Sequence, residues 1–144
     1  MRNAKVFCVL LLGSVISFGQ QQPQWTVVEH VELMQQSQTI PLTTLLTPAE
    51  SGVYRLTAYF SSVGGTAATT WSESLSATDV TGGLVNGNLN LNCRTGHYWS
   101  STPPITAVLK ANAPVTYQVS NNGAATCQYN LVIVVEELQQ PTNH

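Results

Sequence analysis

Four residues that could bind a ligand lie close together in the segment CRTGHYWSS at positions 93–101. They supply a cation, an imidazole and two large aromatic rings: Arg94, His97, Tyr98 and Trp99. Aromatic rings of this kind can stack on a sugar, while the cation and the imidazole donate hydrogen bonds to it. The same residues also fit a hairpin turn whose aromatic side chains cover one end of a hydrophobic core. A binding loop and a structural end cap therefore both stay open.

Side chains for hydrolytic catalysis are few. A Ser-His-Asp arrangement needs a base beside the nucleophile and an acid that orients the base, but Asp79 is the only aspartate and no Gly-x-Ser-x-Gly segment occurs. Glycoside hydrolysis needs two carboxylates that face one cleft. Glu29, Glu32 and Glu73 could supply them, yet each falls in an expected strand, where an exposed glutamate is ordinary. We expect no enzyme, and a secreted hydrolase with an unrecognised site stays as an alternative.

The best candidates for metal ligands are His30 and Glu32. They lie two positions apart, so on a strand they point to the same face. Two ligands do not form a site, and a polar outer strand face explains the pair as well. A single aspartate cannot supply the carboxylate oxygens that calcium prefers. We therefore expect neither a metal nor a cofactor.

Charged residues are scarce, at 8% of the 144 residues, with five Lys or Arg and seven Asp or Glu. No cluster of basic residues occurs, although nucleic acid or an anionic membrane would need several on one face. We expect no nucleic-acid partner. Uncharged Ser, Thr, Asn and Gln must keep the protein in solution instead.

The first 19 residues have the pattern of an export signal. Arg2 and Lys5 precede an apolar run at 6–15, and Ser17-Phe18-Gly19 has small residues at the positions that a signal peptidase reads. The run has roughly ten residues where a spanning helix needs about twenty, and no later segment is long enough to span a bilayer. We expect cleavage after Gly19 and a single domain at 20–144 with short flexible tails. The protein should then be secreted to an extracellular or periplasmic compartment.

Cleavage would leave two cysteines, Cys93 and Cys127, in a compartment where thiols oxidise. We expect them to form a disulfide. Free thiols, a metal site and a redox pair are the alternatives, but a metal site would need more Cys or His nearby and a redox pair would need a close Cys-x-x-Cys. A disulfide closing a loop of about 35 residues stabilises a fold by about 3 to 4 kcal/mol on the chain-entropy model.

The elements that must position these residues are strands. Apolar residues alternate with period two, β-branched residues dominate, and no segment after residue 20 has a helical pattern. We predict strands at 25–34, 39–46, 52–63, 66–78, 89–93, 105–111, 115–119 and 127–137. Turn residues separate them, including Gly82-Gly83 and Asn86-Gly87. About eight short strands with such turns indicate an all-β fold, an antiparallel β-sandwich of the jelly-roll kind.

Two of these strands carry a resemblance to a known family. The segment GVYRLTAY at 52–59 resembles the Gly-x-Tyr-x-Phe segment of the jelly-roll domains shared by complement heads and tumour necrosis factor. The segment YNLVIVV at 129–135 resembles the terminal inner strand of such domains, and also small bacterial and phage structural proteins. The resemblance implies a trimer-forming binding or structural module, and it carries no catalytic residues over.

Four residues on these strands predict self-association. Val53 and Tyr59, and likewise Val132 and Val134, alternate with a second apolar set and should therefore point away from the core. An apolar patch of this kind needs cover, and a second copy of the chain would provide it. The segment 25–46 could instead cover that face within one chain. The favoured number of subunits, three, comes only from the family resemblance.

Together these observations favour a secreted, non-enzymatic structural or binding protein that self-associates. The first alternative is a carbohydrate-binding module that uses the 94–99 loop. A glycan or a cell surface is the corresponding partner.

Overall fold

The computed structural model describes residues 22–65, 69–93, 99–123 and 127–139. The predicted signal peptide at 1–19 lies outside this range, as do Arg94, His97 and Tyr98. The described residues form strands and no helix, and so none that could cross a membrane. The strands are β1 (Gln24–Gln36), β2 (Ile40–Leu46), β3 (Gly52–Val63), β4 (Thr69–Thr78), β5 (Leu84–Cys93), β6 (Trp99–Ser101), β7 (Ile105–Leu109), β8 (Val115–Asn121) and β9 (Gln128–Gln139).

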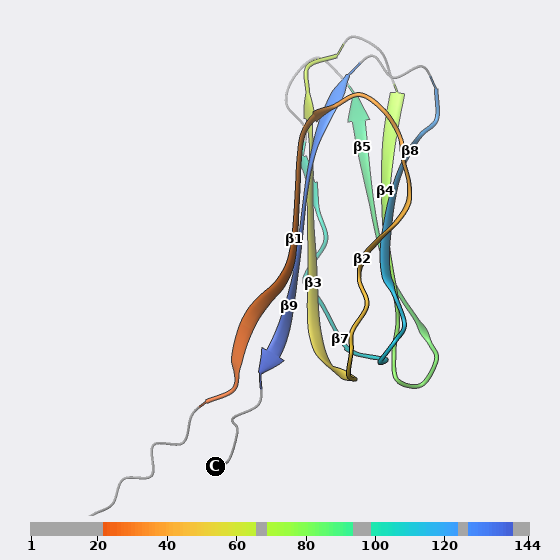
Figure 1. Ribbon diagram of the computed structural model, residues 1–144. Coiled ribbons are helices and arrows are strands. Elements are labelled where there is room, and N and C mark those ends of the chain that lie inside the picture. Colours follow the sequence, from red (N-terminus) through yellow and green to blue (C-terminus); the bar gives the residue numbers. More distant parts are fainter. Residues whose placement is uncertain (1–21, 66–68, 94–98, 124–126, 140–144) are drawn as a thin grey trace, which may run out of the picture.

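The strands form two sheets that pack face to face (Figure 1). Sheet A has the order β1-β9-β3-β6, with β7 also paired to β3, and sheet B has the order β2-β8-β4-β5. All pairs are antiparallel. β6 and β7 pair with different parts of β3 and together act as one interrupted strand. When β6 and β7 are counted as one strand, the order of the strands in the two sheets is that of a jelly roll. The predicted fold class is therefore confirmed.

The period-two pattern explains which side chains enter the core. In the two central strands of sheet A, every second residue is buried, from Tyr54 to Ser62 in β3 and from Tyr129 to Val135 in β9. Phe60 and Trp71 contact Tyr129, with ring centroids 5.2 Å and 4.7 Å from its ring. Trp71 is fully buried, and its indole N–H donates to the Cys127 carbonyl at 3.3 Å. It is a core residue.

The disulfide joins the two sheets at one end of the sandwich. Cys93 ends β5 in sheet B, and Cys127 immediately precedes β9 in sheet A. The two residues form the predicted bond, with Cα atoms 5.8 Å apart, and both are buried. The disulfide prediction is therefore confirmed.

One predicted turn is wrong. Asn86 and Gly87 lie inside β5, which begins at Leu84, and not between strands. Gly87 faces the core opposite Leu75, and a Cβ at this position would lie 2.9 Å from the Ile105 Cδ1 atom. The glycine is thus needed for close packing and not for a turn. The turn before β5 is made at Gly82, where φ is +87°.

The N-terminal strands cover neither outer face. β1 pairs with β9 and extends sheet A sideways, and β2 pairs with β8 at the edge of sheet B. Pro41 lies in β2, an edge strand, where its missing N–H costs least. The suggestion that segment 25–46 shields the outer face of the long central strands is therefore wrong.

Candidate functional site

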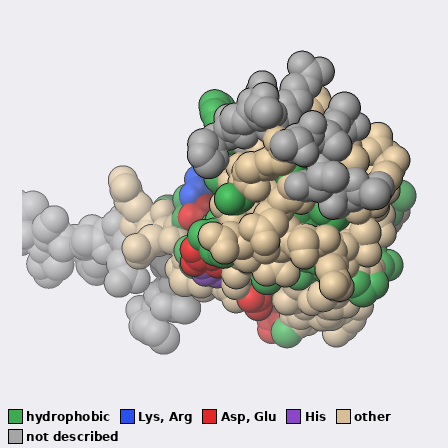
Figure 2. Space-filling view, turned by 90° about the horizontal axis from the view of Figure 1, so that it is seen from above, with side chains coloured by type: hydrophobic (Ala, Val, Ile, Leu, Met, Phe, Trp, Pro, Cys, Tyr) green, Lys and Arg blue, Asp and Glu red, His purple; other side chains and the backbone are tan. Residues whose placement is uncertain are grey.

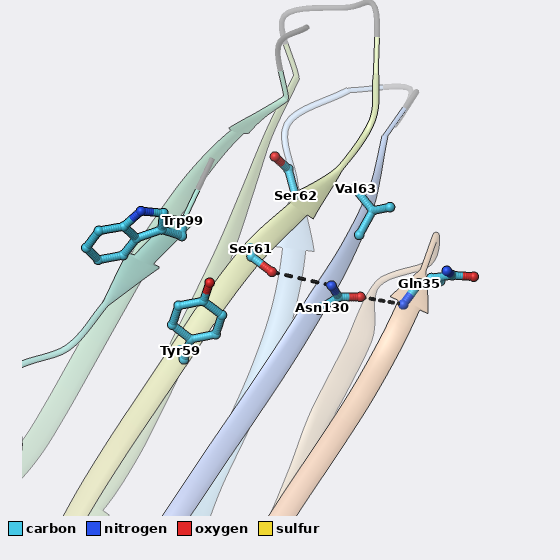
Figure 3. Close-up of a pocket in the computed structure, with 7 residues that line it drawn as sticks. All are labelled: Gln35, Tyr59, Ser61, Ser62, Val63, Trp99 and Asn130. Carbon is cyan, nitrogen blue, oxygen red and sulfur yellow. Dashed lines mark hydrogen bonds between the residues drawn. The ribbon is translucent and has the colours of Figure 1, made fainter. Parts of the chain in front are cut away.

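A hollow of about 320 Å³ lies on the outer face of sheet A, near the disulfide end. Four adjoining strands or strand ends form it, and Figure 3 shows its side chains. We call it the aromatic hollow. It is lined by Gln35, Tyr59, Ser61, Ser62, Val63, Trp99 and Asn130.

Strand register brings these residues together from distant parts of the chain. Ser61 of β3 is paired on one side with Asn130 of β9 and on the other with Trp99 of β6. Tyr59 lies two positions before Ser61 and so points to the same outer face. Paired residues of neighbouring strands share a face, so this row of the sheet presents an indole, a hydroxyl and a carboxamide in sequence.

Two aromatic rings form the apolar part of the hollow. Trp99 is 67% exposed and Tyr59 is 41% exposed. Their ring centroids lie 6.4 Å apart, and the ring planes differ by only 20°. Such large rings are normally buried because each contributes a large apolar area. Two nearly parallel rings left in solvent offer flat apolar faces to a ligand.

The polar part of the hollow is held by Asn130. Its Oδ1 atom accepts a hydrogen bond from the Gln35 backbone N–H at 2.8 Å, and its amide nitrogen donates to the Ser61 Oγ atom at 3.4 Å. Figure 3 draws both bonds. Gln35 has a φ of +53° and sits in an irregularity of the β1–β9 register between Leu33 and Gln36. Asn130 therefore fixes this bulge at the rim of the hollow.

None of the seven lining residues is charged. The hollow can therefore offer hydroxyl and carboxamide groups for hydrogen bonding but no countercharge for an ionic ligand. Two exposed aromatic faces next to neutral donors and acceptors are suited to a ligand with both an apolar face and hydroxyl groups.

Of the four ligand-binding residues expected from the sequence, the structure places Trp99 in the hollow. It is the first residue of β6, a strand that the sequence did not indicate. Tyr59, Ser61, Asn130 and Gln35 were not predicted to join it. An available signal was Tyr59 itself, an aromatic residue at an outward position of a central strand.

Three of the four residues expected at an oligomer interface adjoin one another. Tyr59 is paired with Val132, and Val134 is paired with Thr57 one row further along the outer face. We call Tyr59, Val132 and Val134 the outer strip. Val53 lies apart from it, paired with Val108 of β7.

An ion pair separates Val53 from the outer strip. The Arg55 guanidinium donates to both Glu136 carboxylate oxygens, at 2.6 and 2.7 Å. The Trp25 ring lies over this guanidinium, 4.5 Å from its central carbon to the ring centroid. Glu136 is paired with Arg55 between the row of Val134 and the end of the sheet. The four residues therefore do not form one continuous patch.

The interpretation of Glu73 as an exposed strand residue is wrong. Its side chain is fully buried on the inner face of β4, between Leu89 of β5 and Val119 of β8. Neither carboxylate oxygen has a hydrogen-bond partner. Burial raises the pKa of this carboxyl to about 7. Because Glu73 points into the core and Glu32 is exposed on β1, the two do not face one cleft.

The candidate metal ligands His30 and Glu32 are paired with Val134 and Val132 on the outer face of sheet A. Within the described ranges, no group of three or more His, Cys, Asp or Glu side chains could hold a metal ion.

The chain matches no known protein-family model, and no curated protein matches its sequence. Several solved structures resemble it at low similarity. The Eiger tumour necrosis factor of S. frugiperda is 12% identical with a TM-score of 0.42, over 80% of this chain and 95% of that one. Tailspike protein 4 of bacteriophage CBA120 is 10% identical with a TM-score of 0.38, over 78% of this chain.

A third similar structure contains the CBM22-1 and GH10 modules of the Clostridium thermocellum xylanase 10B, complexed with xylohexaose. It is 14% identical with a TM-score of 0.37, over 85% of this chain. The chain spans only 19% of the tailspike chain and 25% of the xylanase chain. A tumour necrosis factor and a phage protein are thus among the structures that this chain weakly resembles.

Proposed function

We propose that this chain is an exported, non-enzymatic binding module that holds a neutral saccharide in the aromatic hollow. The observation that carries the proposal is the pair of nearly parallel, solvent-exposed rings of Trp99 and Tyr59. A pyranose ring has an apolar C–H face that stacks on such rings, and its edge carries hydroxyl groups. Ser61, Gln35 and Asn130 supply neutral partners for those hydroxyls at the rim.

Export is supported by two independent features of the chain. The first 19 residues have the pattern of a signal peptide. The Cys93–Cys127 disulfide is typical of proteins that fold in an oxidising compartment. Mass spectrometry of secreted material should find a chain that begins near Gln20 and has no free thiol.

A glycan array followed by calorimetric titration tests saccharide binding. We expect the wild-type protein to bind neutral oligosaccharides, and Trp99→Ala to weaken binding at least tenfold through loss of the stacking face. Leu42→Ala is the matched control, because Leu42 is also 67% exposed but lies on β2 in the other sheet. Binding that survives Trp99→Ala, or an array with no neutral glycan bound, would contradict the proposal.

Self-association is a second candidate function. It is favoured by the position of β1 beside β9, which places no second layer over the outer strip: Tyr59 is exposed, and Val132 and Val134 are half-buried. Apolar side chains on an outer sheet face are stabilised when another subunit buries them. A homotrimer is the expected assembly, and its number of subunits comes from the sequence resemblance to trimer-forming domains.

Light scattering of the mature protein tests this second function. A mass of three chains is expected, and the Val132→Lys, Val134→Lys variant should fall to one chain. The matched control, Thr116→Lys with Gln118→Lys, places two lysines on β8 in sheet B and should leave the mass unchanged. A wild-type mass of one chain ends the proposal.

A further inference from the structure

The outer face of sheet B differs from ordinary protein surface in having no charge at all across three strands. Apart from Leu84 at the start of β5, its outward positions on β4, β5 and β8 carry only hydroxyl or carboxamide groups. We call this surface the polar face. It consists of Thr70, Ser72, Ser74, Ser76, Asn86, Asn88, Asn90, Asn92, Thr116, Gln118 and Ser120. In Figure 2, the charged side chains in view lie to the left and at the lower edge, and none is seen on the right-hand side.

The register arranges these residues in rows. Ser72 lies between Ser120 and Asn90, and Ser74 lies between Gln118 and Asn88. The next row repeats the order with Thr116, Ser76 and Asn86. Rows of one face are about 6.8 Å apart along a strand, and neighbouring strands are about 4.8 Å apart. The polar face is therefore a regular two-dimensional array of neutral hydrogen-bonding groups.

Hydrogen bonds between β4 and β5 hold this array in one orientation. The Thr70, Ser72 and Ser76 hydroxyls donate to the Oδ1 atoms of their paired asparagines at 2.9, 2.8 and 2.9 Å. The paired asparagines are Asn92, Asn90 and Asn86. Each bond uses the amide oxygen and leaves the amide N–H groups to donate outward. A row of ordered, outward amide donors thus follows the β4–β5 seam.

The chemistry of this face selects its partner. An ionic surface would find no countercharge on it. An apolar surface would remove amides and hydroxyls from water without giving them hydrogen bonds, which is unfavourable. A neutral surface with its own periodic hydroxyl groups would satisfy them. Each exchange of water for such a partner contributes little alone, so only a solid that engages many groups at once would be held.

We infer that the polar face is a second binding surface, which adsorbs to a solid of extended, neutral polysaccharide chains. This inference goes beyond the aromatic hollow and does not depend on it. The two surfaces lie on opposite outer faces of the sandwich, so no single stretch of polymer contacts both. A module with both surfaces links two polymer chains.

Adsorption of the mature protein to three insoluble neutral glycans tests the inference. The probes are microcrystalline cellulose, chitin and a β-1,3-glucan, and the readout is the ratio of bound to free protein after sedimentation. We expect the wild-type protein to bind at least one of them. Asn88→Asp with Asn90→Asp should lower that ratio at least tenfold, because both substitutions keep the side-chain shape while placing charge in the array.

Two control variants separate adsorption by the polar face from a general effect of charge and from binding by the hollow. Gln24→Glu with Gln38→Glu adds the same charge outside the polar face, at exposed positions, and should leave adsorption unchanged. Trp99→Ala should also leave it unchanged, although it removes saccharide binding by the hollow. If adsorption is lost in Trp99→Ala and kept in the asparagine variant, the aromatic hollow and not the polar face binds the solid, and the inference is overturned. Failure of the folded wild-type protein to bind any of the three solids would overturn it too.

If the double variant does not fold, which its thermal transition would reveal, Ser74→Arg is the second variant. The Ser74 hydroxyl makes no hydrogen bond within the described ranges, and its outward position tolerates a longer side chain. The arginine should lower adsorption at least tenfold in a folded protein, and unchanged adsorption would contradict the inference.

Discussion

The two sheets distribute polar chemistry in opposite ways. The inner face of sheet A is apolar along its central strands, while its outer face carries the aromatic hollow and the ion pair of Arg55 with Glu136. Sheet B has a neutral outer face, and its one buried acidic residue, Glu73, points into the core. A period-two pattern thus tells on which face a side chain lies, but not whether its charge is satisfied there.

Glu136 of sheet A and Glu73 of sheet B make the difference between the two sheets measurable. The Arg55 guanidinium beside Glu136 lowers the pKa of that carboxyl, because it favours the charged form. Burial without any hydrogen bond raises the pKa of Glu73 to about 7, because it disfavours the charged form. One sheet therefore has a carboxylate that stabilises the fold when charged, and the other has one that destabilises it when charged.

The largest effect is expected when the connection between the two sheets is broken. Cys93→Ser with Cys127→Ser removes the one disulfide, which closes a loop with a sequence separation of 34. The free energy of unfolding should fall by about 3 to 4 kcal/mol on the chain-entropy model. Urea unfolding with and without reducing agent measures it. Reduction should give wild-type protein the same loss and leave the double variant unchanged.

Glu73 should give an effect of similar size that depends on pH. In the unfolded chain this carboxyl ionises near its ordinary pKa of 4.5, and in the native state near 7. Between these values the native state binds more protons, so stability falls as pH rises from about 4.5 to about 7 and is then constant. A shift of this size corresponds to about 3 kcal/mol.

The isosteric variant Glu73→Gln isolates this contribution. It should be more stable than wild-type protein above pH 7 and should lose most of the slope between pH 4.5 and 7. Chemical unfolding at a series of pH values checks both. A wild-type slope that persists in Glu73→Gln would show that another group causes it.

The close approach of Gly65 to the Cys127 side chain should give the next largest effect. Gly65 has a φ of +138°, and a Cβ there would lie 2.5 Å from the Cys127 Cβ atom. Gly65→Ala should therefore cost about 2 kcal/mol or more through both strain and overlap. The adjacent Gly64→Ala is the control: its φ is +66° and its added Cβ would meet nothing within 4 Å, so about 1 kcal/mol is expected. Equal thermal shifts for the two variants would contradict the argument.

The sequence was sufficient to predict the sandwich because its signals are local. Alternation identified the long strands, and the two cysteines left after the expected cleavage predicted the disulfide. The same alternation places Glu73 in phase with Trp71 and Leu75. The residue type nevertheless favours an exposed position, because a buried glutamate without a partner is rare. The pattern was the better guide than the residue type.

The aromatic hollow could be predicted only in part. Trp99 was a candidate because its neighbours in the sequence are polar and aromatic. Asn130 and Ser61 are 69 residues apart in the chain, and only the pairing of β9 with β3 joins them. Such a register depends on the packing of the whole sheet, so a local pattern does not contain it.

The smallest effect on stability is expected from Glu136→Gln. Its pH dependence should have the opposite sign to that of Glu73→Gln, so the two variants together test the comparison between the sheets. The lowered pKa of Glu136 means that its ion pair stabilises the fold above the ordinary pKa of 4.5, and that this contribution is lost as pH falls through the native value. The variant should thus be slightly less stable than wild-type protein at pH 7 and equal to it in strong acid.

Both side chains are partly exposed, 32% for Arg55 and 19% for Glu136, so solvent weakens their attraction. Salt at about 1 M should reduce the difference, since it shortens the screening length to about 3 Å. The Glu73→Gln difference should persist in that salt because no ions reach the core. A salt-sensitive Glu73 effect, or a salt-resistant Glu136 effect, would show that the environments of the two carboxylates are not as different as their positions in the two sheets indicate.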